Sequence, residues 1–429
     1  MRRTAGLLLT ALLASGCGSG TGSPGGPGDG GPASASVRFL LFGDPTETAG
    51  YQQLAEEFEK ANDGVDVNVT PVPTQDDLLA KLTTSFAGGQ PPDVFLINYR
   101  KYGQFAARDA LTPVQDRLDS SDVLSEEDFA DTALDPFRFD GETLTCLPQN
   151  VSSLEVYYNV DMFEAAGVSL PEAGWSWDDF LSAAQALTKD GVYGVGTEPS
   201  LIRMAPFVWS AGGEVVDDQL APTKLTLGSG AGRRGLDFFL DLQTEHQVAP
   251  PEKEELSQGS EDRFLAGQLG MYLDSRKAVP SLREIEDFTW DVAPLPVAPG
   301  GEPATILHGD AYCLPAAAAN QEAAWRFVEY ANSTEGQTIL ARSGRTVPSR
   351  LDVARSGVFL RPDAPPKSSQ VFVDAIPDIR AVPHTATWSE VEKAADDVIA
   401  AMYYGRLERD AGLRQLNEVT EPLFGSPPG

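Results

Sequence analysis

The stretch VRFLLFGDP, residues 37–45, combines the features that decide the fold. Its first part, Val37 to Phe42, is a mainly apolar run of strand length, and the Gly-Asp-Pro at 43–45 interrupts it. Apolar residues then recur at helical spacing, at Tyr51, Leu54, Ala55 and Phe58. The stretch therefore predicts a strand, a loop and a helix in succession.

The same alternation continues along the chain. Valine occupies alternate positions of 65–69, as in a strand, and residues 76–87 give a second helix. Residues 93–97 form the next short strand, which opens into a polar aromatic loop at 98–102. Such alternation implies a largely parallel sheet with helices on both faces, where ligands gather at the carboxyl ends of the strands.

The later chain repeats this pattern. Ser176 can cap a helix with Asp179 three residues on, and that helix is expected to run to about Asp190 and stop at Gly191. Further helices are predicted, with Pro-rich breaks between them, at 233–245, 320–331, 334–342, 389–404 and 408–419. The fold class expected is α/β.

Length and charge limit the functions to consider. A chain of 429 residues fits two domains rather than one core. The 63 acidic and 32 basic side chains give a net charge of -31, which repels nucleic acid and anionic lipid headgroups. Polyanionic partners are therefore not expected, and the acidic surface is interpreted as an aid to solubility.

The start of the chain predicts export. Arg2 and Arg3 precede a short apolar run, and small residues stand directly before Cys17, which predicts a signal peptide at 1–16. The ASGC at 14–17 resembles a bacterial lipobox, in which the cysteine is acylated. Residues 17–36 have the composition of a flexible tether. The alternative is an ordinary secretory signal with an incidental cysteine.

The remaining cysteines and the histidines give weaker signals. Cys146 and Cys313 are compatible with one disulfide in an exported chain, although sequence alone does not show that they meet. The histidines, His246, His308 and His384, form no cluster with metal-ligand spacing. No metal and no cofactor are expected.

Several motifs follow one another in a fixed order: FAGGQPPDV at 86–94, YYNVDMF at 157–163, WSAGG at 209–213, APLP at 293–296 and AWRF at 324–327. In this order they resemble the family 1 extracellular solute-binding proteins of ABC importers, a maltose-binding-protein-like group that includes bacterial lipoproteins. The resemblance covers nearly the whole mature chain. It implies a two-lobed fold of the periplasmic-binding-protein type, in which the lobes close over a ligand.

The resemblance also implies where the lobes divide. The first lobe is expected at 37–149 plus 277–317, and the second at 150–276 plus 318–429. Each lobe should contain a mostly parallel sheet flanked by helices. The segments that cross between the lobes should fall near Gln149–Ser152, Leu273–Lys277 and Pro315–Asn320.

Candidate ligand-binding residues follow from strand ends, crossings and the resemblance: Asp44, Asn98, Tyr99, Arg100, Asn150, Ser152, Trp209, Asp274, Arg276, His308, Asp310, Arg345 and Trp388. A cleft of this kind binds sugar through aromatic faces and planar polar side chains. Asp44 has an alternative role as a helix cap, the two tryptophans as core residues, and His308 as a structural residue. At 275–277 the chain has Ser-Arg-Lys where the family usually has Gly and Trp, which leaves the class of solute open.

The resemblance implies the substrate-binding lipoprotein of an ABC importer. Such a protein is extracytoplasmic and monomeric, is attached to the outer face of the cytoplasmic membrane only through its lipid, and binds no nucleic acid. It captures a sugar, oligosaccharide or polyol and delivers it to the permease membrane subunits without chemical change. The alternatives are an exported ligand-sensing receptor and an exported glycoside hydrolase, but no G-x-S-x-G or H-E-x-x-H motif supports catalysis.

Overall fold

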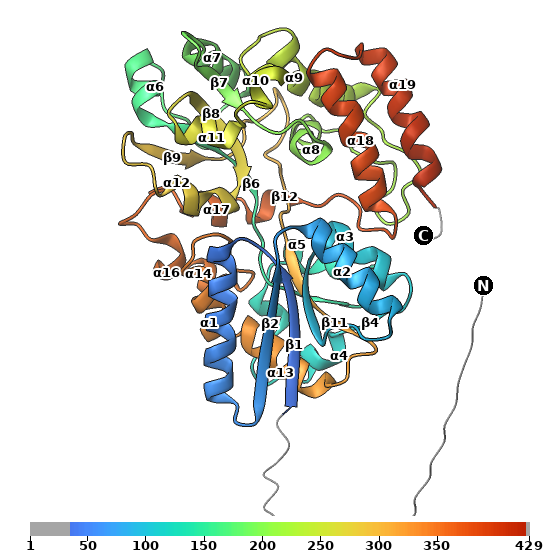
Figure 1. Ribbon diagram of the computed structural model, residues 1–429. Helices are drawn as coiled ribbons and strands as arrows, with labels where there is room; N and C mark the ends of the chain where they lie inside the picture. The colour runs from blue at the N-terminus through green and yellow to red at the C-terminus, as the bar shows by residue number, and fades with distance from the viewer. Residues whose placement is uncertain (1–34, 426–429) are drawn as a thin grey trace, which may run out of the picture. The chain divides into compact units, whose positions relative to one another are not determined.

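The computed structural model describes residues 35–425 (Figure 1). The predicted signal peptide at 1–16, Cys17 and all but the last two residues of the predicted tether lie outside the described residues. Within residues 35–425, no helix is both long enough and apolar enough to span a lipid bilayer.

The opening stretch forms the strand and helix that it predicts. Strand β1 (Ala35–Phe42) begins two residues before Val37, because its first residues pair with the start of β2 (Val65–Val72). Helix α1 (Pro45–Ala61) follows, and Asp44 caps it by accepting a hydrogen bond from a first-turn backbone N–H at 2.9 Å. The last two residues of the predicted tether therefore belong to the first sheet.

The first sheet has the strand order β2-β1-β3-β11-β4, with β5 paired to β11. Its remaining strands are β3 (Val94–Asn98), β4 (Leu111–Thr112), β5 (Leu147–Pro148) and β11 (Asp310–Pro315). Strand β1 runs parallel to β2 and β3, whereas β11 runs antiparallel to β3, β4 and β5. Asp310, the first residue of β11, is the register partner of Asn98, the last residue of β3.

Helices cover both faces of this sheet. On one face, Phe39 of β1 contacts Tyr51 of α1 and Phe327 of α13. On the other face, Phe95 of β3 contacts Phe105 of α3. The larger helices of this lobe, besides α1, are α2 (Gln75–Ala87), α3 (Tyr99–Ala106), α13 (Gln321–Asn332) and α14 (Thr334–Ala341), and the short ones are α4 (Gln115–Asp119), α5 (Asp131–Leu134), α15 (Leu351–Ala354) and α16 (Gly357–Leu360).

The second sheet has the order β7-β8-β6-β9. Its strands are β6 (Leu154–Asn159), β7 (Tyr193–Gly196), β8 (Leu269–Ser275) and β9 (Trp290–Ala293). The helices that surround it are α6 (Val160–Ala166), α7 (Trp177–Leu187), α8 (Leu201–Ser210), α9 (Gly230–Thr244), α10 (Glu252–Glu255), α11 (Ser260–Leu265), α12 (Val279–Leu282), α17 (Gln370–Asp374), α18 (Trp388–Tyr403) and α19 (Arg409–Thr420). Figure 1 shows this sheet and the first one as separate bodies of the described part.

Capping residues and apolar spacing in the sequence predicted most of these helices correctly. Ser176 caps α7 in a capping box with Asp179, but the helix ends at Leu187, and Gly191 lies in the turn beyond it. The five later helices predicted from sequence correspond to α9, α13, α14, α18 and α19, with ends shifted by no more than a few residues.

Both sheets are mixed rather than mostly parallel. In the second sheet β6 is antiparallel to both β8 and β9, and only β7 and β8 are parallel. In the first sheet β11 is reversed because the chain re-enters the sheet from the second lobe, at the edge where β3 ends. Strands β1 and β3 end at the junction of the two lobes, whereas β11 begins there, so β11 runs in the opposite direction.

One expected crossing is confirmed and two are wrong. Gln149–Ser152 joins β5 of the first sheet to β6 of the second. Leu273–Lys277 does not cross, since β8 is followed by β9 of the same sheet, and Pro315–Asn320 connects β11 to α13 within the first lobe. The return crossing instead includes His308, whose backbone forms a bridge with Ser152.

The lobe boundaries change accordingly. Residues 277–317 were assigned to the first lobe, but β9 lies within this range and pairs with β6 of the second. Residues 318–429 were assigned to the second lobe, but α13 and α14 pack against α1 of the first. Helices α18 and α19 contact α9 and each other, as expected for the second lobe. A short two-stranded sheet, β10 (Thr305–Ile306) with β12 (Ile379–Arg380), joins segments near the crossings.

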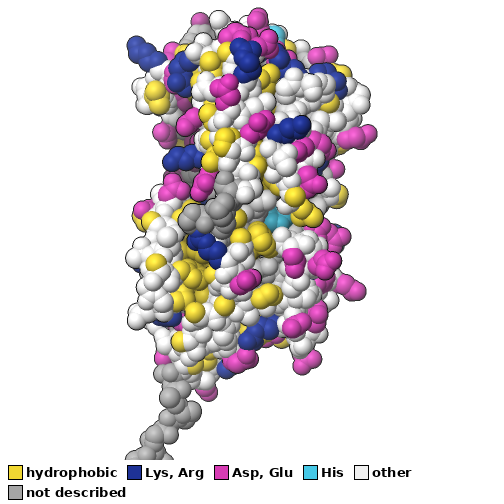
Figure 2. All heavy atoms as spheres, turned by 90° about the vertical axis from the view of Figure 1, so that its right-hand side faces the viewer, with side chains coloured by type: hydrophobic (Ala, Val, Ile, Leu, Met, Phe, Trp, Pro, Cys, Tyr) yellow, Lys and Arg dark blue, Asp and Glu magenta, His cyan; other side chains and the backbone are white. Residues whose placement is uncertain are grey.

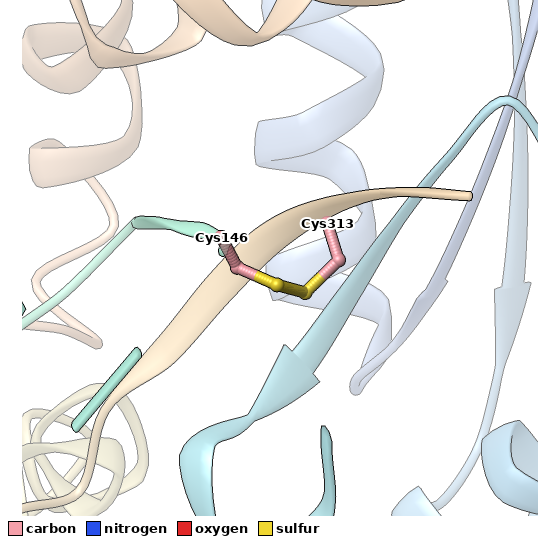
Figure 3. Close-up of a disulfide and its surroundings, with 2 residues drawn as sticks. All are labelled: Cys146 and Cys313. Atoms are coloured by element: carbon pink, nitrogen blue, oxygen red, sulfur yellow. A yellow bond between two sulfur atoms is a disulfide. The ribbon is translucent and has the colours of Figure 1, made fainter. Parts of the chain in front are cut away.

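Cys146 and Cys313 form a disulfide within the first lobe (Figure 3). Cys313 lies in β11 and Cys146 directly precedes β5, and both side chains are fully buried. Since β5 pairs with β11, the bond links two segments that are already neighbours in the sheet. The pairing that the sequence left open is therefore present in the structure.

Acidic side chains are scattered over the face of the described residues that Figure 2 shows. Lys and Arg side chains lie among them on this face. Within the described residues, acidic and basic side chains also form ion pairs, such as Arg117 with Glu322 at 2.6 Å. This distribution agrees with a solubilising role for the excess of acidic residues.

Candidate functional site

A cavity of about 320 Å³ lies where the two lobes meet, and we call it the central cavity. Its lining is mostly polar and charged and consists of Phe42, Glu47, Gln75, Asn98, Arg100, Lys101, Asn150, Ser152, Glu198, Ser200, Ile202, Arg203, Ser275, Lys277, His308, Asp310, Arg345, Thr346, Glu392 and Asp396. Both lobes and the crossing segments contribute to it.

Strand ends bring these residues together. Phe42 ends β1, Asn98 ends β3 and Ser275 ends β8, while Glu198 comes two residues after β7. Loops and helix starts follow these strand ends, so their side chains converge on one region, as in other α/β folds that bind ligands at the carboxyl edges of their sheets. The strand-loop-helix pattern of the sequence thus accounts for the position of the cavity.

A carboxylate and two amides form one wall. Asp310 accepts hydrogen bonds from Asn98 Nδ2 and Asn150 Nδ2, each at 3.1 Å. Burial raises the pKa of Asp310, although both amide donors act in the opposite direction. Asn150 is 1% exposed, and its Oδ1 atom has no hydrogen-bond partner within the described residues. This wall therefore presents a buried acceptor to a guest.

Arg203 and His308 also line the cavity, and Asp274 lies behind them. Arg203 of α8 donates from Nη2 to Asp274 Oδ1 at 2.5 Å, and its Nη1 lies 3.4 Å from His308 Nε2. Burial raises and the Arg203 charge lowers the pKa of Asp274, and the net shift is downward. Burial, followed by the nearby Arg203 charge, lowers the pKa of His308 well below its ordinary value. His308 is therefore neutral, and Asp274 is ionised.

Arg345 lines the cavity and forms ion pairs with two carboxylates. Its Nη1 lies 2.6 Å from Asp44 Oδ2 and its Nε lies 2.8 Å from Glu47 Oε2. Burial raises the pKa of Glu47 to about 7, even though Arg345 acts in the opposite direction. Glu47 therefore changes its protonation state near neutral pH.

An ion pair connects the two lobes across the cavity. Arg100 of α3 pairs with Glu392 of α18, and the backbone oxygen of Arg100 accepts a hydrogen bond from Ser389 Oγ at 3.1 Å. One turn further along α18, Asp396 accepts a hydrogen bond from the backbone N–H of Leu201 at 2.7 Å. Burial, followed by the charges of neighbouring carboxylates, raises the pKa of Asp396 to about 7.

Most of the sequence-predicted residues lie on or beside the central cavity. Seven of them line it: Asn98, Arg100, Asn150, Ser152, His308, Asp310 and Arg345. Asp44 lines an adjoining cavity that shares Lys277 and Arg345 with the central one, and it caps α1 at the same time. Asp274 lies behind the lining, where it holds Arg203. Their roles as ligand contacts stay predictions.

Two aromatic residues that were expected to contact ligand lie elsewhere. Tyr99 is fully buried, because it starts α3 with its ring in the core, where its hydroxyl accepts a hydrogen bond from the backbone N–H of Val382 at 3.3 Å. Trp209 is 5% exposed, and the Arg380 guanidinium covers its ring at 5.0 Å. Neither ring lines the central cavity, so neither is available there for stacking on a sugar.

Trp388 and Arg276 are likewise buried outside the lining. Trp388 is fully buried at the start of α18, and its indole N–H donates to Glu392 Oε2 at 3.2 Å. Arg276 is fully buried between Phe359 and Phe372, with its guanidinium 4.2 Å and 4.5 Å from their ring centres. The neighbouring residue, Ser275, occupies the lining in place of Arg276.

No metal centre is apparent in the described part of the chain. Among residues 35–425, no group of three or more His, Cys, Asp or Glu side chains is arranged to hold a metal ion. The polar and charged lining of the central cavity offers hydrogen bonding and charge pairing.

Comparison with known proteins identifies the family. The family described as bacterial extracellular solute-binding protein matches residues 43–338. The chain belongs to this family. A protein of Brucella abortus strain 2308 named as a binding protein is 24% identical over 387 residues, which is 88% of this chain and 90% of the relative. A maltooligosaccharide ABC transporter solute-binding lipoprotein of Streptococcus pneumoniae strain R6 is 22% identical and covers 97% of this chain and 96% of its own length.

Solved structures show the same two-lobed fold. An ABC substrate-binding protein from Listeria monocytogenes, in complex with cycloalternan, aligns with a TM-score of 0.80 and 22% identity over 91% of this chain and 98% of that one. The family and these neighbours are binding proteins, and the fold class expected from the sequence is confirmed.

Seven charged lining residues of this solute-binding protein were missed by the sequence reasoning. Lys101 and Lys277 each adjoin a predicted candidate, and the other five are Glu47, Glu198, Arg203, Glu392 and Asp396. Of these five, all but Glu198 lie on helices, where a polar residue in the sequence is normally interpreted as facing solvent. Arg203 had a usable signal, since it is a charged residue within the otherwise apolar segment of α8. The other four had none in the sequence.

Proposed function

We propose that this solute-binding protein captures a small polyhydroxylated solute, such as a sugar, oligosaccharide or polyol, in the central cavity. It delivers this solute unchanged to the permease subunits of an ABC importer. It is held at the outer face of the cytoplasmic membrane by a lipid on Cys17. Membership of the extracellular solute-binding family and the name of the Streptococcus pneumoniae lipoprotein support this assignment.

One observation in the cavity carries the proposal. Three buried polar atoms in its lining, Asn150 Oδ1, Ser200 Oγ and Arg203 Nε, have neither a hydrogen-bond nor an ion-pair partner within the described residues. Glu47 Oε2 also lacks a hydrogen-bond partner there but is ion-paired with Arg345. A buried polar group without a partner costs about 1–3 kcal/mol, so a guest that supplies hydroxyl groups is stabilised by pairing with these atoms. Hydroxyls both donate and accept, and they therefore match this mixture of acceptors and donors.

The composition of the lining sets the size and character of the guest. Among the described residues, Phe42 and His308 are the only aromatic rings that line the central cavity, so stacking contributes little. The volume of about 320 Å³ lies at the lower end of small-molecule sites. Both features favour a guest of one or two sugar rings that is recognised mainly through its polar groups.

Thermal-shift measurements on monosaccharides, disaccharides and polyols test the proposal, because a ligand that binds only the folded state raises the melting temperature. At least one compound should stabilise the mature chain. Asn150→Ala should weaken its binding by about tenfold, since a donor of the guest then loses its buried acceptor, which costs about 1–3 kcal/mol. Asn68→Ala is the matched control, because Asn68 is exposed on β2 and far from the lining. If no hydroxylated compound raises the melting temperature, the proposal is wrong.

The transport steps need separate tests. Chromatography after prolonged incubation should return the bound sugar intact, and appearance of hydrolysis products would favour an enzyme instead. Cells that carry Cys17→Ala should release the protein from the membrane fraction. Uptake of the labelled solute should then fall, whereas a sensing receptor would leave uptake unchanged.

A further inference from the structure

The charges around the central cavity are unequal. Five cationic side chains line it: Arg100, Lys101, Arg203, Lys277 and Arg345. Each already has a carboxylate partner in the protein. Arg100 pairs with Glu392, Lys101 with Asp76, Arg203 and Lys277 with Asp274, and Arg345 with Asp44 and Glu47. The cations of the cavity are therefore matched before any guest arrives.

Three further carboxyls line the same cavity without such a partner. Glu198, Asp310 and Asp396 form no ion pair with any residue in the described range 35–425. Asp310 accepts hydrogen bonds only from amides, and Asp396 accepts one from a backbone N–H. With the partners of its cations included, the cavity thus has more carboxyls than cations. Burial raises the pKa of Asp310 and brings that of Asp396 to about 7, so this surplus is only partly ionised near neutral pH, and a bound cation would favour the ionised form.

Two of these carboxyls lie near one another. Glu198 follows β7, and Asp396 on α18 holds the backbone N–H of Leu201 at the start of α8. Both carboxyls line the central cavity, and the charge of Glu198 is one of the smaller contributions to the raised pKa of Asp396. Ser200 lies two residues after Glu198 and directly before Leu201, whose N–H Asp396 holds, and it lines the same cavity.

Ser200 gives an independent indication of a guest at this position. Its side chain is 5% exposed, and its Oγ atom has no hydrogen-bond partner within the described residues. Across the cavity, Asn150 Oδ1 is a second buried acceptor without a donor. Among the unpaired lining atoms, Asn150 Oδ1 and Ser200 Oγ accept hydrogen bonds, whereas Arg203 Nε donates one. An alkylammonium group supplies three donors and one positive charge, and it satisfies both the hydrogen-bonding and the charge imbalance.

We infer that the solute carries a protonated amine, as in an amino sugar or amino polyol, and that its ammonium group binds beside Glu198, Ser200 and Asp396. The hydroxyls of the same solute contact Asn150, Asp310 and Arg203. This inference rests on the proposed function, since it names the chemical class of the polyhydroxylated guest. A neutral sugar would leave the excess carboxylates unbalanced, and an anionic sugar would be repelled by them.

Calorimetric titration of the mature chain with matched pairs of compounds tests the inference. The pairs are D-glucosamine with D-glucose, D-galactosamine with D-galactose, and 1-amino-1-deoxysorbitol with sorbitol, with N-acetylglucosamine and glucuronate added. The expected result is that at least one amine binds about tenfold or more tightly than its hydroxyl counterpart, since a charge-assisted hydrogen bond is roughly twice as strong as a neutral one. Acetylation should remove this preference because it removes the charge.

Variants distinguish the site from a general effect of the acidic protein. Glu198→Gln combined with Asp396→Asn should bring the ratio of amine to hydroxyl affinity close to one. Asp397→Asn is the matched control: it removes a carboxylate from the next, exposed position of α18, outside the cavity, and should keep the preference. Melting curves of each variant confirm folding before titration.

The outcomes separate the two proposals. If a neutral sugar binds as tightly as its amine, or glucuronate binds more tightly, the inference is overturned and the proposed function stands. A preference that survives the double variant, or that Asp397→Asn removes equally, also overturns it. If no compound of any charge binds, the proposed function fails and the inference fails with it.

Discussion

Removal of the disulfide between Cys146 and Cys313 should destabilise the protein by an amount that the structure allows one to calculate. The two residues are 167 positions apart in sequence. For a closed loop of this length, the chain-entropy relation gives about 5 kcal/mol at 25 °C. An unfolding entropy of about 2.1 cal/mol/K per residue over roughly 390 residues then converts this into a melting temperature lower by about 6 °C.

Urea unfolding and calorimetry of four chains provide the assay. All carry Cys17→Ala, so that the pair contains the only thiols, and three of them also carry Cys146→Ala, Cys313→Ala or both changes. Each single substitution already breaks the bond. The single and double variants should therefore lose nearly the same free energy of unfolding, within about 1 kcal/mol, because the effects of residues that share one interaction are not additive.

Additive losses of unfolding free energy in the single and double variants would refute this reasoning. If each single substitution costs less than about 1 kcal/mol and the double variant costs their sum, the two thiols act as independent buried side chains. Counting free thiols in the denatured Cys17→Ala chain gives a second check. The bonded protein should react with none, and two reactive thiols would contradict the pairing.

Three further changes test the charges and the packing around the site. Asp396 has a pKa of about 7 in the folded state against an ordinary value of 3.8. The folded state therefore binds the proton more tightly than the unfolded state, and stability falls as pH rises from about 4 to 7. Asp396→Asn should remove up to ~4 kcal/mol of this fall, as measured by melting experiments across pH. Arg203→Met should cost about 3–5 kcal/mol in urea unfolding, because it leaves the buried Asp274 without its guanidinium, and adding Asp274→Asn should restore part of the loss. Gly103→Ala would place its Cβ 2.1 Å from a backbone oxygen and should lower stability by about 1–3 kcal/mol, whereas Gly228→Ala, with open space around it, should change stability by less than about 0.5 kcal/mol.

Elements with local signals could be predicted from the sequence, and contacts between distant segments could not. The strand at 37–42 and its following helix depend on apolar spacing and on the Asp44 cap, both of which lie within a few residues. Strand β9 was placed in the wrong lobe, because its pairing with β6 joins residues more than a hundred positions apart. Short strands carry no local information about which sheet they join.

The same limit explains the site. Asn98 and Asp310 could be found because each lies at the end of a strand, where the fold class already predicts ligand contacts. Arg276 could not be distinguished from Ser275, since adjacent residues point to opposite sides and the sequence does not show which side is the cavity. Trp209 was expected to stack on a sugar, but the distant Arg380 covers its ring.

The polar lining has a consequence for specificity. In the central cavity, Asn150 Oδ1, Ser200 Oγ and Arg203 Nε each need a partner from the guest. A related compound that lacks one matching hydroxyl or amine leaves such an atom unpaired at about 1–3 kcal/mol, and two mismatches reduce affinity by orders of magnitude. A cavity of this kind therefore selects one arrangement of polar groups, so a screen should show a few strong binders among closely similar compounds that bind poorly.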